Sequence, residues 1–500
     1  MGSRYCHWTS FCVTILLASV ASAVAADDSS PKSLAGSRPN VMVILCDDLG
    51  YGDLACQGHP TIRTPNLDRL ASQGIRLTSC YASAPVCSSS RAGLMTGRTP
   101  GRNGVYDWIP EGHVMHLPAG EITIATLLKD ADYETCHVGK WHLNGKFNQP
   151  AQPQPGDHGF DHWFSTQNNA RPTHHNPKNF VRNGEEVKPL EGYSCQLVAD
   201  EAIRWLDSRA NGQEPFFQFV CFHEPHEKVK SPPKLIASYL DDEGPKARNE
   251  DEAQYFANVT NMDLAVGRLM AALDERDLTE STLVFFTSDN GPETLKRYRN
   301  ATRSYGSPGP LRGMKLWLYE GGIRVPGIVR WPGVVKSGCV SDVPVCGVDV
   351  LPTLCELAGR EPPADRPLDG TSLVPLMAGK PFERETPLYW SYINSLGKPT
   401  AAMRIGDYLI LGTPVQDQAA GRSHGRNVNP KSMRYFKTEE LSDFQLYNVA
   451  EDIGQKDDLA ESDPERMKEY AARLVERHRE VQQEGPTWEF PMEAGAARKK

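Results

Sequence analysis

Residues 87–98 read Cys-Ser-Ser-Ser-Arg-Ala-Gly-Leu-Met-Thr-Gly-Arg, and the elements on either side of this stretch predict the fold. The stretch itself predicts a helix that begins near Cys87 and carries Arg91 one turn later. The N–H groups and the positive dipole at a helix N-terminus attract anions, and Arg91 points its guanidinium at the same end. Taken alone, the stretch favours a plainer interpretation, a helix with a buried or disulfide-bonded cysteine.

Apolar runs alternate with helical patterns over most of the chain. A short run at 41–46 is typical of a strand buried on both faces. The alternation predicts an α/β fold with a mostly parallel sheet covered by helices on both faces, in which functional loops follow the carboxyl ends of strands. The predicted strands cover 41–46, 133–138, 216–222 and 282–287, and the predicted helices cover 64–74, 122–130, 197–208 and 251–275.

The character of the sequence changes after about residue 370. Short strand candidates at 388–392, 401–405, 408–411 and 444–448 precede a predicted helix at 464–482. We therefore expect a catalytic domain at 39–370, a smaller α+β subdomain with an antiparallel sheet at 371–485, and a tail at 486–500.

The first residues are typical of a secretory signal peptide. Arg4 precedes an apolar run at 11–20, and Ala23-Val24-Ala25 offers a cleavage site. We expect a signal peptide at 1–25, a linker at 26–38, and an exported protein with no stable membrane anchor. The net charge of −9, without a long basic tract, gives no electrostatic footprint for nucleic acid.

Ten of the twelve cysteines follow the predicted cleavage site. Their scattered spacing indicates neither a disulfide scaffold nor a zinc site. Cys46, Cys136 and Cys221 lie in apolar runs, where we expect small buried side chains.

Acidic and amide side chains follow two of the predicted strands. Asp47 and Asp48 end the first strand, and Asp289 and Asn290 follow the strand that ends at Thr287. Adjacent carboxylates repel unless a cation lies between them, and oxygen-only ligands suit a hard cation such as calcium. For a lone Asp-Asp pair, a solvated loop is the commoner explanation.

Basic and imidazole side chains follow two more strands. Lys140 and His142 come after the strand ending at Val138, and His226 comes after the strand ending at Phe222. A lysine supplies a compact positive charge for an anion, and a histidine moves protons near neutral pH. Singly, each could be an ordinary surface or packed residue.

Together these motifs resemble those of the type I sulfatases, within the alkaline-phosphatase-like superfamily. The resemblance covers about 39–376 and rests on Cys-x-x-x-Arg leading into Leu-Met-Thr-Gly-Arg, on Gly-Lys-Trp-His at 139–142, on Pro225-His226, and on the segment 311–326, besides the acidic pairs. It departs from the family pattern at Ser89, where Pro or Ala is usual.

The resemblance implies a formylglycine nucleophile formed from Cys87 by a maturation enzyme, and a bound calcium ion. The implied calcium ligands are Asp47, Asp48, residue 87, Asp289 and Asn290. The implied catalytic residues are Cys87, Arg91 (which holds the hydrated aldehyde), Lys140 and Lys315 (which bind sulfate), His142 (which takes a proton from the hydrate) and His226 (which protonates the leaving group).

Sulfated carbohydrates are the substrates that we expect from the family, with galactose and N-acetylgalactosamine sulfates first. Aromatic, charged and imidazole side chains in the loops between the motifs suit a sugar ring. These candidates are Asp107, Trp108, Arg171, His174, His175 and His223, each of which could equally be a surface or packing residue. The sequence leaves the oligomeric state open.

Two alternatives stay open. A phosphodiesterase or phosphonate hydrolase of the same superfamily commonly uses transition metals and more Asp and His ligands than Asp47, Asp48, Asp289 and Asn290 provide. A non-catalytic protein that binds sulfated glycans would result if Cys87 were not converted, although the complete set of basic and imidazole residues argues against loss of catalysis.

Overall fold

The computed structural model of the chain describes residues 33–209, 212, 214–241, 244–295, 302–415 and 427–490. The predicted signal peptide (1–25), most of the predicted linker (26–32) and the end of the predicted tail (491–500) lie outside the described residues. Residues 34–500 form one compact unit.

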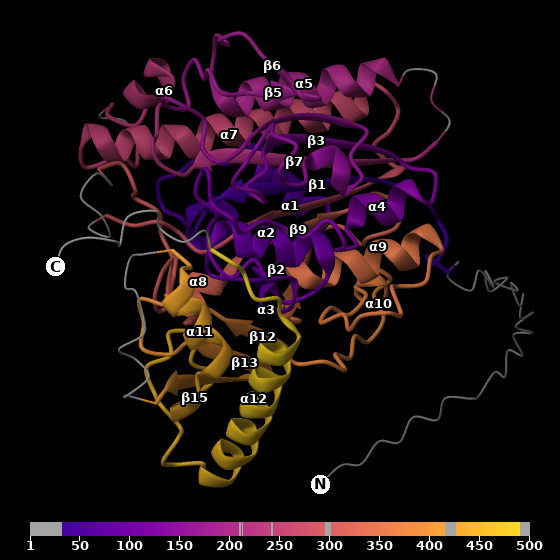
Figure 1. Cartoon of the computed structure of the whole chain (residues 1–500). Coiled ribbons are helices and arrows are strands. Elements are labelled where there is room, and N and C mark those ends of the chain that lie inside the picture. The colour runs from indigo at the N-terminus through magenta and orange to yellow at the C-terminus, as the bar shows by residue number, and fades with distance from the viewer. Residues whose placement is uncertain are drawn as a thin grey trace, which may run out of the picture. The chain divides into compact units, whose positions relative to one another are not determined.

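A large mixed sheet organises the first part of this unit (Figure 1). Its order is β10-β2-β9-β8-β1-β7-β3-β4-β5-β6, and β11 pairs with β2. The pairs of β1 with β7 and β8, and of β3 with β7 and β4, are parallel, whereas β9 runs antiparallel to both β8 and β2. The bounds are β1 Asn40–Asp47, β2 Ile75–Tyr81, β3 Glu134–Lys140, β4 His162–Thr166, β5 Val181–Arg182, β6 Glu185–Glu186, β7 Phe216–Pro225, β8 Thr282–Ser288, β9 Arg324–Arg330, β10 Cys339–Ser341 and β11 Val345–Cys346.

Strand β1 explains why the sheet needs cover on both faces. Val41, Val43 and Leu45 enter one apolar cluster, and Met42, Ile44 and Cys46 enter another on the opposite face. Successive strand side chains point to opposite faces, so an unbroken apolar run buries both. Helices α2 (Cys87–Thr96), α4 (Ile124–Lys129) and α9 (Val350–Ala358) cover the first face, and α1 (Pro65–Ser72), α5 (Ser194–Ser208) and α7 (Glu250–Asp274) cover the second (Figure 1). The predicted fold class is confirmed.

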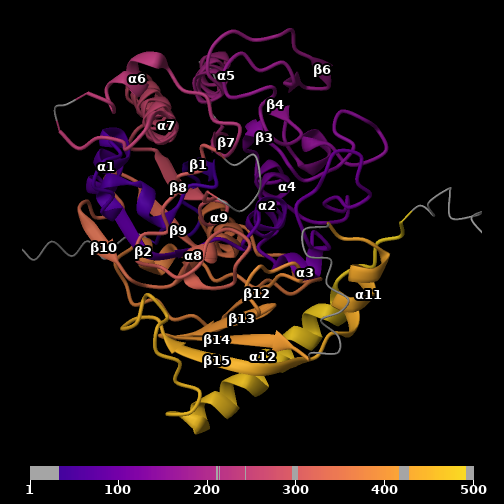
Figure 2. The same cartoon turned by 90° about the vertical axis from the view of Figure 1, so that its left-hand side faces the viewer.

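A separate four-stranded antiparallel sheet, β12-β13-β14-β15, follows in the sequence (Figure 2). Helix α12 packs Leu474 and Val481 against its outer face. The inner face meets the first sheet, where the indole nitrogen of Trp390 donates to the carbonyl oxygen of Ala82 at 2.8 Å. The bounds are β12 Leu388–Ser391, β13 Ala401–Ile405, β14 Tyr408–Pro414, β15 Leu441–Asn448, α11 Pro430–Thr438 and α12 Pro464–Glu484.

All of the strands and helices named from the sequence are present, with ends shifted by a few residues. The sequence patterns did not indicate the strands β2, β4, β5, β6, β10 and β11 or the helices α9 and α11. They also missed the short helices α3 (Pro100–Asn103), α6 (Pro233–Ala237), α8 (Glu320–Ile323) and α10 (Val374–Met377). The ten cysteines among the described residues are unpaired, and Cys46, Cys136 and Cys221 are buried as predicted. No helix within the described ranges has both the length and the apolar character that a membrane crossing requires.

Candidate active site

Four neighbouring strands bring the predicted motifs to one edge of the large sheet. Strands β8, β1, β7 and β3 are adjacent and mutually parallel. Asp47 ends β1, Lys140 ends β3, His226 follows β7, and Asp289 follows β8. The carboxyl ends of parallel strands lie at the same edge, which is where ligands bind in open α/β sheets.

Helix α2 presents Cys87 to this edge as its first residue. The N-cap residue, Val86, makes no side-chain capping bond, and all ten residues of the helix are buried. Arg91 lies one turn further on, and its Nε and Nη2 donate to Asp289 Oδ2 at 3.0 and 2.8 Å. Its Nη1 donates to the carbonyl oxygen of Lys140 at 2.9 Å. The guanidinium therefore ties α2 to the ends of β3 and β8.

Two lysines pair with the two adjacent carboxylates. Lys140 Nζ lies 2.5 Å from Asp47 Oδ2, and Lys315 Nζ lies 2.6 Å from Asp48 Oδ1. With the Arg91–Asp289 pair, three buried cations face three buried carboxylates. A divalent cation added to this balanced set would give the site a net positive charge, which suits an anionic ligand.

Three buried oxygens at this edge have no hydrogen-bond partner among the residues that the structure describes: Asp47 Oδ1, Asp48 Oδ2 and Asn290 Oδ1. The amide of Asn290 is fixed because its Nδ2 donates to Asp48 Oδ1 at 2.7 Å, which leaves its oxygen available. Ligand atoms of Asp47, Cys87 and Asp289 lie within 4.8 Å of one another. Buried unpaired oxygens are costly without a partner, and carboxylate and amide oxygens are the ligands of calcium, so these residues fit that ion.

Burial and charge set the protonation of the site. Burial raises the pKa of the Cys87 thiol to about 11, although Lys140 and Lys315 oppose the shift. Burial also opposes ionisation of Asp48, but Lys315 and His226 outweigh it and hold the pKa of that carboxyl below its usual range. An unmodified Cys87 therefore carries a protonated thiol near neutral pH, which is a weak nucleophile.

The two predicted catalytic histidines have defined orientations. His226 Nδ1 lies 2.6 Å from the carbonyl oxygen of Glu227, and its Nε2 lies 3.6 Å from Asp48 Oδ2. His142 Nε2 lies 3.1 Å from the carbonyl oxygen of Ile109, whereas its Nδ1 has no partner within the described part of the chain. A carbonyl oxygen can only accept a hydrogen bond, so these contacts place the ring hydrogens on Nδ1 of His226 and Nε2 of His142. Burial lowers the pKa of His226 to about 3 and that of His142 well below its ordinary value.

Glycines allow the strand end and the lysine loop to approach their neighbours. Gly139 has a φ of +101°, and a Cβ there would lie 1.8 Å from the carbonyl oxygen of Cys221 in β7. A Cβ on Gly322 would lie 2.0 Å from the carbonyl oxygen of Trp317, in the loop that carries Lys315. Both sulfate-binding candidates, Lys140 and Lys315, are thus held by backbone packing that only glycine permits.

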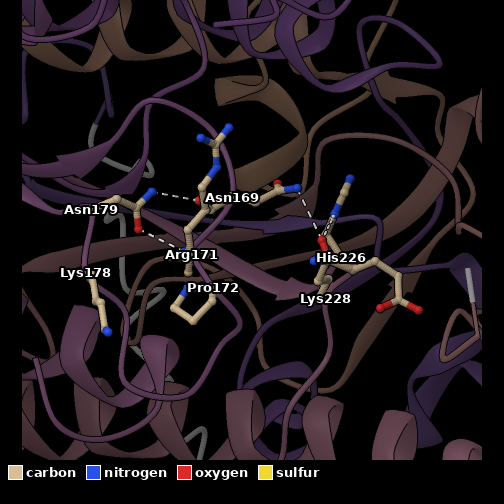
Figure 3. Close-up of a pocket in the computed structure, with 9 residues that line it drawn as sticks. Asn169, Arg171, Pro172, Lys178, Asn179, His226 and Lys228 are labelled. Carbon is tan, nitrogen blue, oxygen red and sulfur yellow. Dashed lines mark hydrogen bonds between the residues drawn. The ribbon is translucent and has the colours of Figure 1, made fainter. Parts of the chain in front are cut away.

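Arg171 is the one predicted substrate residue that lines a pocket at the site. This pocket of about 660 Å³ opens beside His226, and Asn169, Lys178, Asn179 and Lys228 also line it (Figure 3). The sequence patterns did not single out these four residues. They lie in irregular segments, where no periodicity marks which side chains face a cavity.

Other predicted substrate residues have internal partners. Asp107 is buried and accepts from Tyr392 Oη at 3.0 Å and Asn394 Nδ2 at 2.7 Å, which ties its loop to the second sheet. The neighbouring Trp108 is 39% exposed and is free to meet a ligand from solvent.

The three remaining histidines each have a partner within the protein, which accords with the packing alternative and leaves substrate contact a prediction. His174 is fully buried, and Asn258 Nδ2 donates to its Nδ1 at 3.1 Å. His223 is fully buried, with its Nε2 2.8 Å from Thr166 Oγ1. The ring of His175 contacts that of Tyr193 in a tilted arrangement, with ring centroids 4.7 Å apart. Segments distant in the sequence supply these partners.

The mostly parallel sheet with its polar site at the carboxyl edge defines an α/β protein of the alkaline-phosphatase-like fold. The family profile described as sulfatase matches residues 39–360. The chain is 34% identical to steryl-sulfatase of Rattus norvegicus over 72% of this chain and 74% of the rat protein. It is 33% identical to N-acetylgalactosamine-6-sulfatase of Canis lupus familiaris over 74% of this chain and 71% of the dog protein.

The crystal structure of Ps i-CgsB in complex with k-i-k-neocarrahexaose superposes with a TM-score of 0.75 and 28% identity, over 90% of this chain and 94% of that chain. The chain belongs to the sulfatase family. It is therefore an enzyme that hydrolyses sulfate esters, and formylglycine and calcium are typical of its family.

Proposed function

We propose that this sulfatase acts on a sulfated carbohydrate, that Cys87 is converted to formylglycine by a maturation enzyme, and that the protein is exported. Calcium would be held by Asp47, Asp48, Asp289 and Asn290, three of which carry the unpaired buried oxygens. When bound, calcium would act as a Lewis acid towards the hydroxyl that residue 87 would present as hydrated formylglycine.

The basic residues bind and orient the sulfate group. Lys140 and Lys315 place two ammonium groups beside the carboxylate pair, where they can neutralise an anionic ester and the charge that develops on the leaving oxygen. Arg91 holds Asp289 and the end of β3 in register with residue 87. Removing one such preorganised donor costs about 100- to 1,000-fold in rate in comparable sites.

The histidines divide the proton transfers. His226 turns Nε2 towards the site, and it would protonate the departing alcohol from this atom, because a bound anion favours the imidazolium that burial opposes. His142 is kept neutral by burial and offers an unpartnered Nδ1, so it would take a proton from the hydrate when sulfate leaves.

The number of amide and charged residues around the pocket beside His226 is the observation that supports a carbohydrate. Asn169, Arg171, Lys178, Asn179 and Lys228 line it, with Ala170 and Pro172 as its only apolar residues among those described. A sterol ring system would require an apolar wall, whereas sugar hydroxyls and charged substituents find donors here. The similarity to an N-acetylgalactosamine-6-sulfatase and to a protein crystallised with neocarrahexaose points the same way.

The test begins with mass spectrometry of the peptide that contains Cys87, after coexpression with a formylglycine-generating enzyme. We expect a loss of roughly 18 Da relative to cysteine. The converted protein should release sulfate from N-acetylgalactosamine 6-sulfate or galactose 6-sulfate far faster than from a steroid sulfate, and Cys87→Ala should release none. A preference for the steroid sulfate would refute the carbohydrate assignment. Faster turnover of a matched phosphate ester would instead favour the phosphoryl-transfer alternative.

A further inference from the structure

The pocket beside His226 carries three positive side chains, and none of them contacts the carboxylates of the candidate metal site. Arg171 and Lys178 come from the loop between β4 and β5, and Lys228 comes from the segment after β7 (Figure 3). We propose that this pocket is a second anion subsite, which binds a sulfate or carboxylate group of the sugar other than the sulfate that is hydrolysed. The inference rests on the proposed carbohydrate substrate and narrows it to sugars with at least two anionic groups.

Hydrogen bonds hold the wall of the pocket in a fixed arrangement (Figure 3). Asn179 Oδ1 accepts from the backbone N–H of Arg171 at 2.9 Å, and its Nδ2 donates to the carbonyl oxygen of Asn169 at 3.0 Å. Asn169 Nδ2 in turn donates to the carbonyl oxygen of Glu227 at 3.2 Å. The two segments that supply the cations are therefore joined, and a preorganised site loses less entropy on binding.

Asn169 also connects the pocket to the catalytic edge. Lys140 Nζ lies 3.4 Å from Asn169 Oδ1, and His226 belongs both to the pocket lining and to the surroundings of Asp48. An anion in the pocket would thus lie on the leaving-group side of the sulfate-binding lysines. That is the position of a substituent on the same sugar or on its neighbour.

Basic side chains outnumber carboxylates in the lining of the pocket, because Arg171, Lys178 and Lys228 face one acidic residue, Glu227, among those described. Its one acidic lining residue among those described, Glu227, is 7% exposed, and its carboxylate accepts from the backbone N–H groups of Val229 and Arg303. Arg171 pairs with Glu111 at 2.8 Å, but both side chains are more than half exposed and can exchange partners. Within the described residues, Lys178 and Lys228 form no ion pair, although both line the pocket.

The residue types favour an anion over neutral hydroxyls. A lysine carries a compact charge that interacts more strongly with an anion than with a neutral hydroxyl. The attraction acts across a partly open pocket, so it should weaken as salt is added.

The test compares the double variant Lys178→Ala/Lys228→Ala with wild type and with Lys188→Ala. Lys188 is exposed and lies outside the pocket lining, so it controls for lost positive charge. Each enzyme is assayed on N-acetylgalactosamine 6-sulfate, on the 4,6-disulfate, and on the disaccharide of glucuronic acid and N-acetylgalactosamine 6-sulfate. The thermal midpoints of all three proteins are compared to exclude misfolding.

We expect the double variant to raise KM for a two-anion substrate about tenfold, the sum of two exposed ion pairs, with kcat nearly unchanged. KM for the monosulfate should change by less than about twofold, Lys188→Ala should resemble wild type, and the tenfold difference should shrink at high salt. Preference for the disulfate would identify a second sulfate as the ligand, and preference for the disaccharide would identify a carboxylate.

Equal losses on all three substrates, or no preference of the wild type for either two-anion substrate, would overturn the inference while leaving the carbohydrate function intact. Turnover of 4-nitrophenyl sulfate without turnover of any sugar would instead refute the proposed function, and the inference with it.

Discussion

Gly139→Ala should inactivate the enzyme, although residue 139 has no side chain that could contact the substrate. The new Cβ would lie 1.8 Å from the carbonyl oxygen of Cys221, whereas real Cβ contacts are essentially never below 3.0 Å, so β3 and β7 would have to separate by about 1.2 Å. Lys140, the next residue, would move with the strand. A misplacement of about 1 Å can cost roughly 100-fold in rate, and we expect at least this loss in kcat/KM, with about 3 kcal/mol or more of lost stability.

Gly58→Ala is the matched control for this prediction. Gly58 has nearly the same φ, +100° against +101°, but nothing lies within 4 Å of its added Cβ. Both variants therefore carry the backbone strain of a positive φ, about 1–2 kcal/mol, and only Gly139→Ala carries the clash. Thermal unfolding and kcat/KM on a chromogenic sulfate ester should separate the two variants. Equal behaviour of both proteins would show that the approach of β3 to β7 does not position Lys140.

Three further predictions concern the metal ion, the guanidinium and an ion-pair cluster. Removal of calcium with EGTA should abolish sulfate release and lower the thermal midpoint, because a ligand at 100 times its Kd contributes about 2.7 kcal/mol; calcium should restore both, and unchanged activity would contradict the metal assignment. Arg91→Lys should lower kcat/KM about 100-fold, because one ammonium cannot make the three hydrogen bonds to Asp289 and the carbonyl of Lys140. Near-wild-type turnover would show that the guanidinium group is dispensable. Burial opposes ionisation of Glu201, but His162 and Arg182 outweigh it and lower its pKa from 4.5 to about 2. The ionised carboxylate therefore contributes fully to the free energy of unfolding above pH 4.5, and this contribution is lost as the pH falls towards 2. At pH 7 the free energy of unfolding of wild type should therefore exceed that of Glu201→Gln by about 1–2 kcal/mol, a figure reduced for the solvent exposure of Arg182. Urea unfolding should show this difference disappearing at low pH. A difference that does not depend on pH would contradict the ionic explanation.

The sequence predicted the catalytic edge because each motif directly follows a periodic element. The apolar run of β1 fixes where Asp47 and Asp48 emerge, and the same holds for Lys140 after β3 and Asp289 after β8. Parallel pairing then brings these residues together without any further information. The helical pattern after Cys87 placed Arg91 one turn away, and the structure has the same spacing.

The sequence could not indicate which loop residues face the pocket beside His226. His174 and His175 were candidate substrate residues by sequence, but Asn258 of α7, far along the chain, gives His174 an internal partner. The opposite holds for Lys178 and Lys228, which look like ordinary surface lysines until the two segments meet across one pocket. The conformation of these segments depends on individual hydrogen bonds made by the side-chain amides of Asn169 and Asn179, and no repeating sequence pattern marks such bonds.

The burial of helix α2 has a consequence for the order of events in the life of the protein. Cys87 is 3% exposed, and every other residue of its helix is buried as well. An enzyme that oxidises this thiol must bind Cys87 and its flanking residues, and none of these residues is accessible on the folded chain. The conversion that we propose would therefore have to precede folding, and chains that fold first would retain a thiol and stay inactive. The fraction of active enzyme would then depend on the rate of conversion relative to the rate of folding, so a variant that folds more slowly should give a larger active fraction. Treatment of the folded protein with the maturation enzyme should convert none of it.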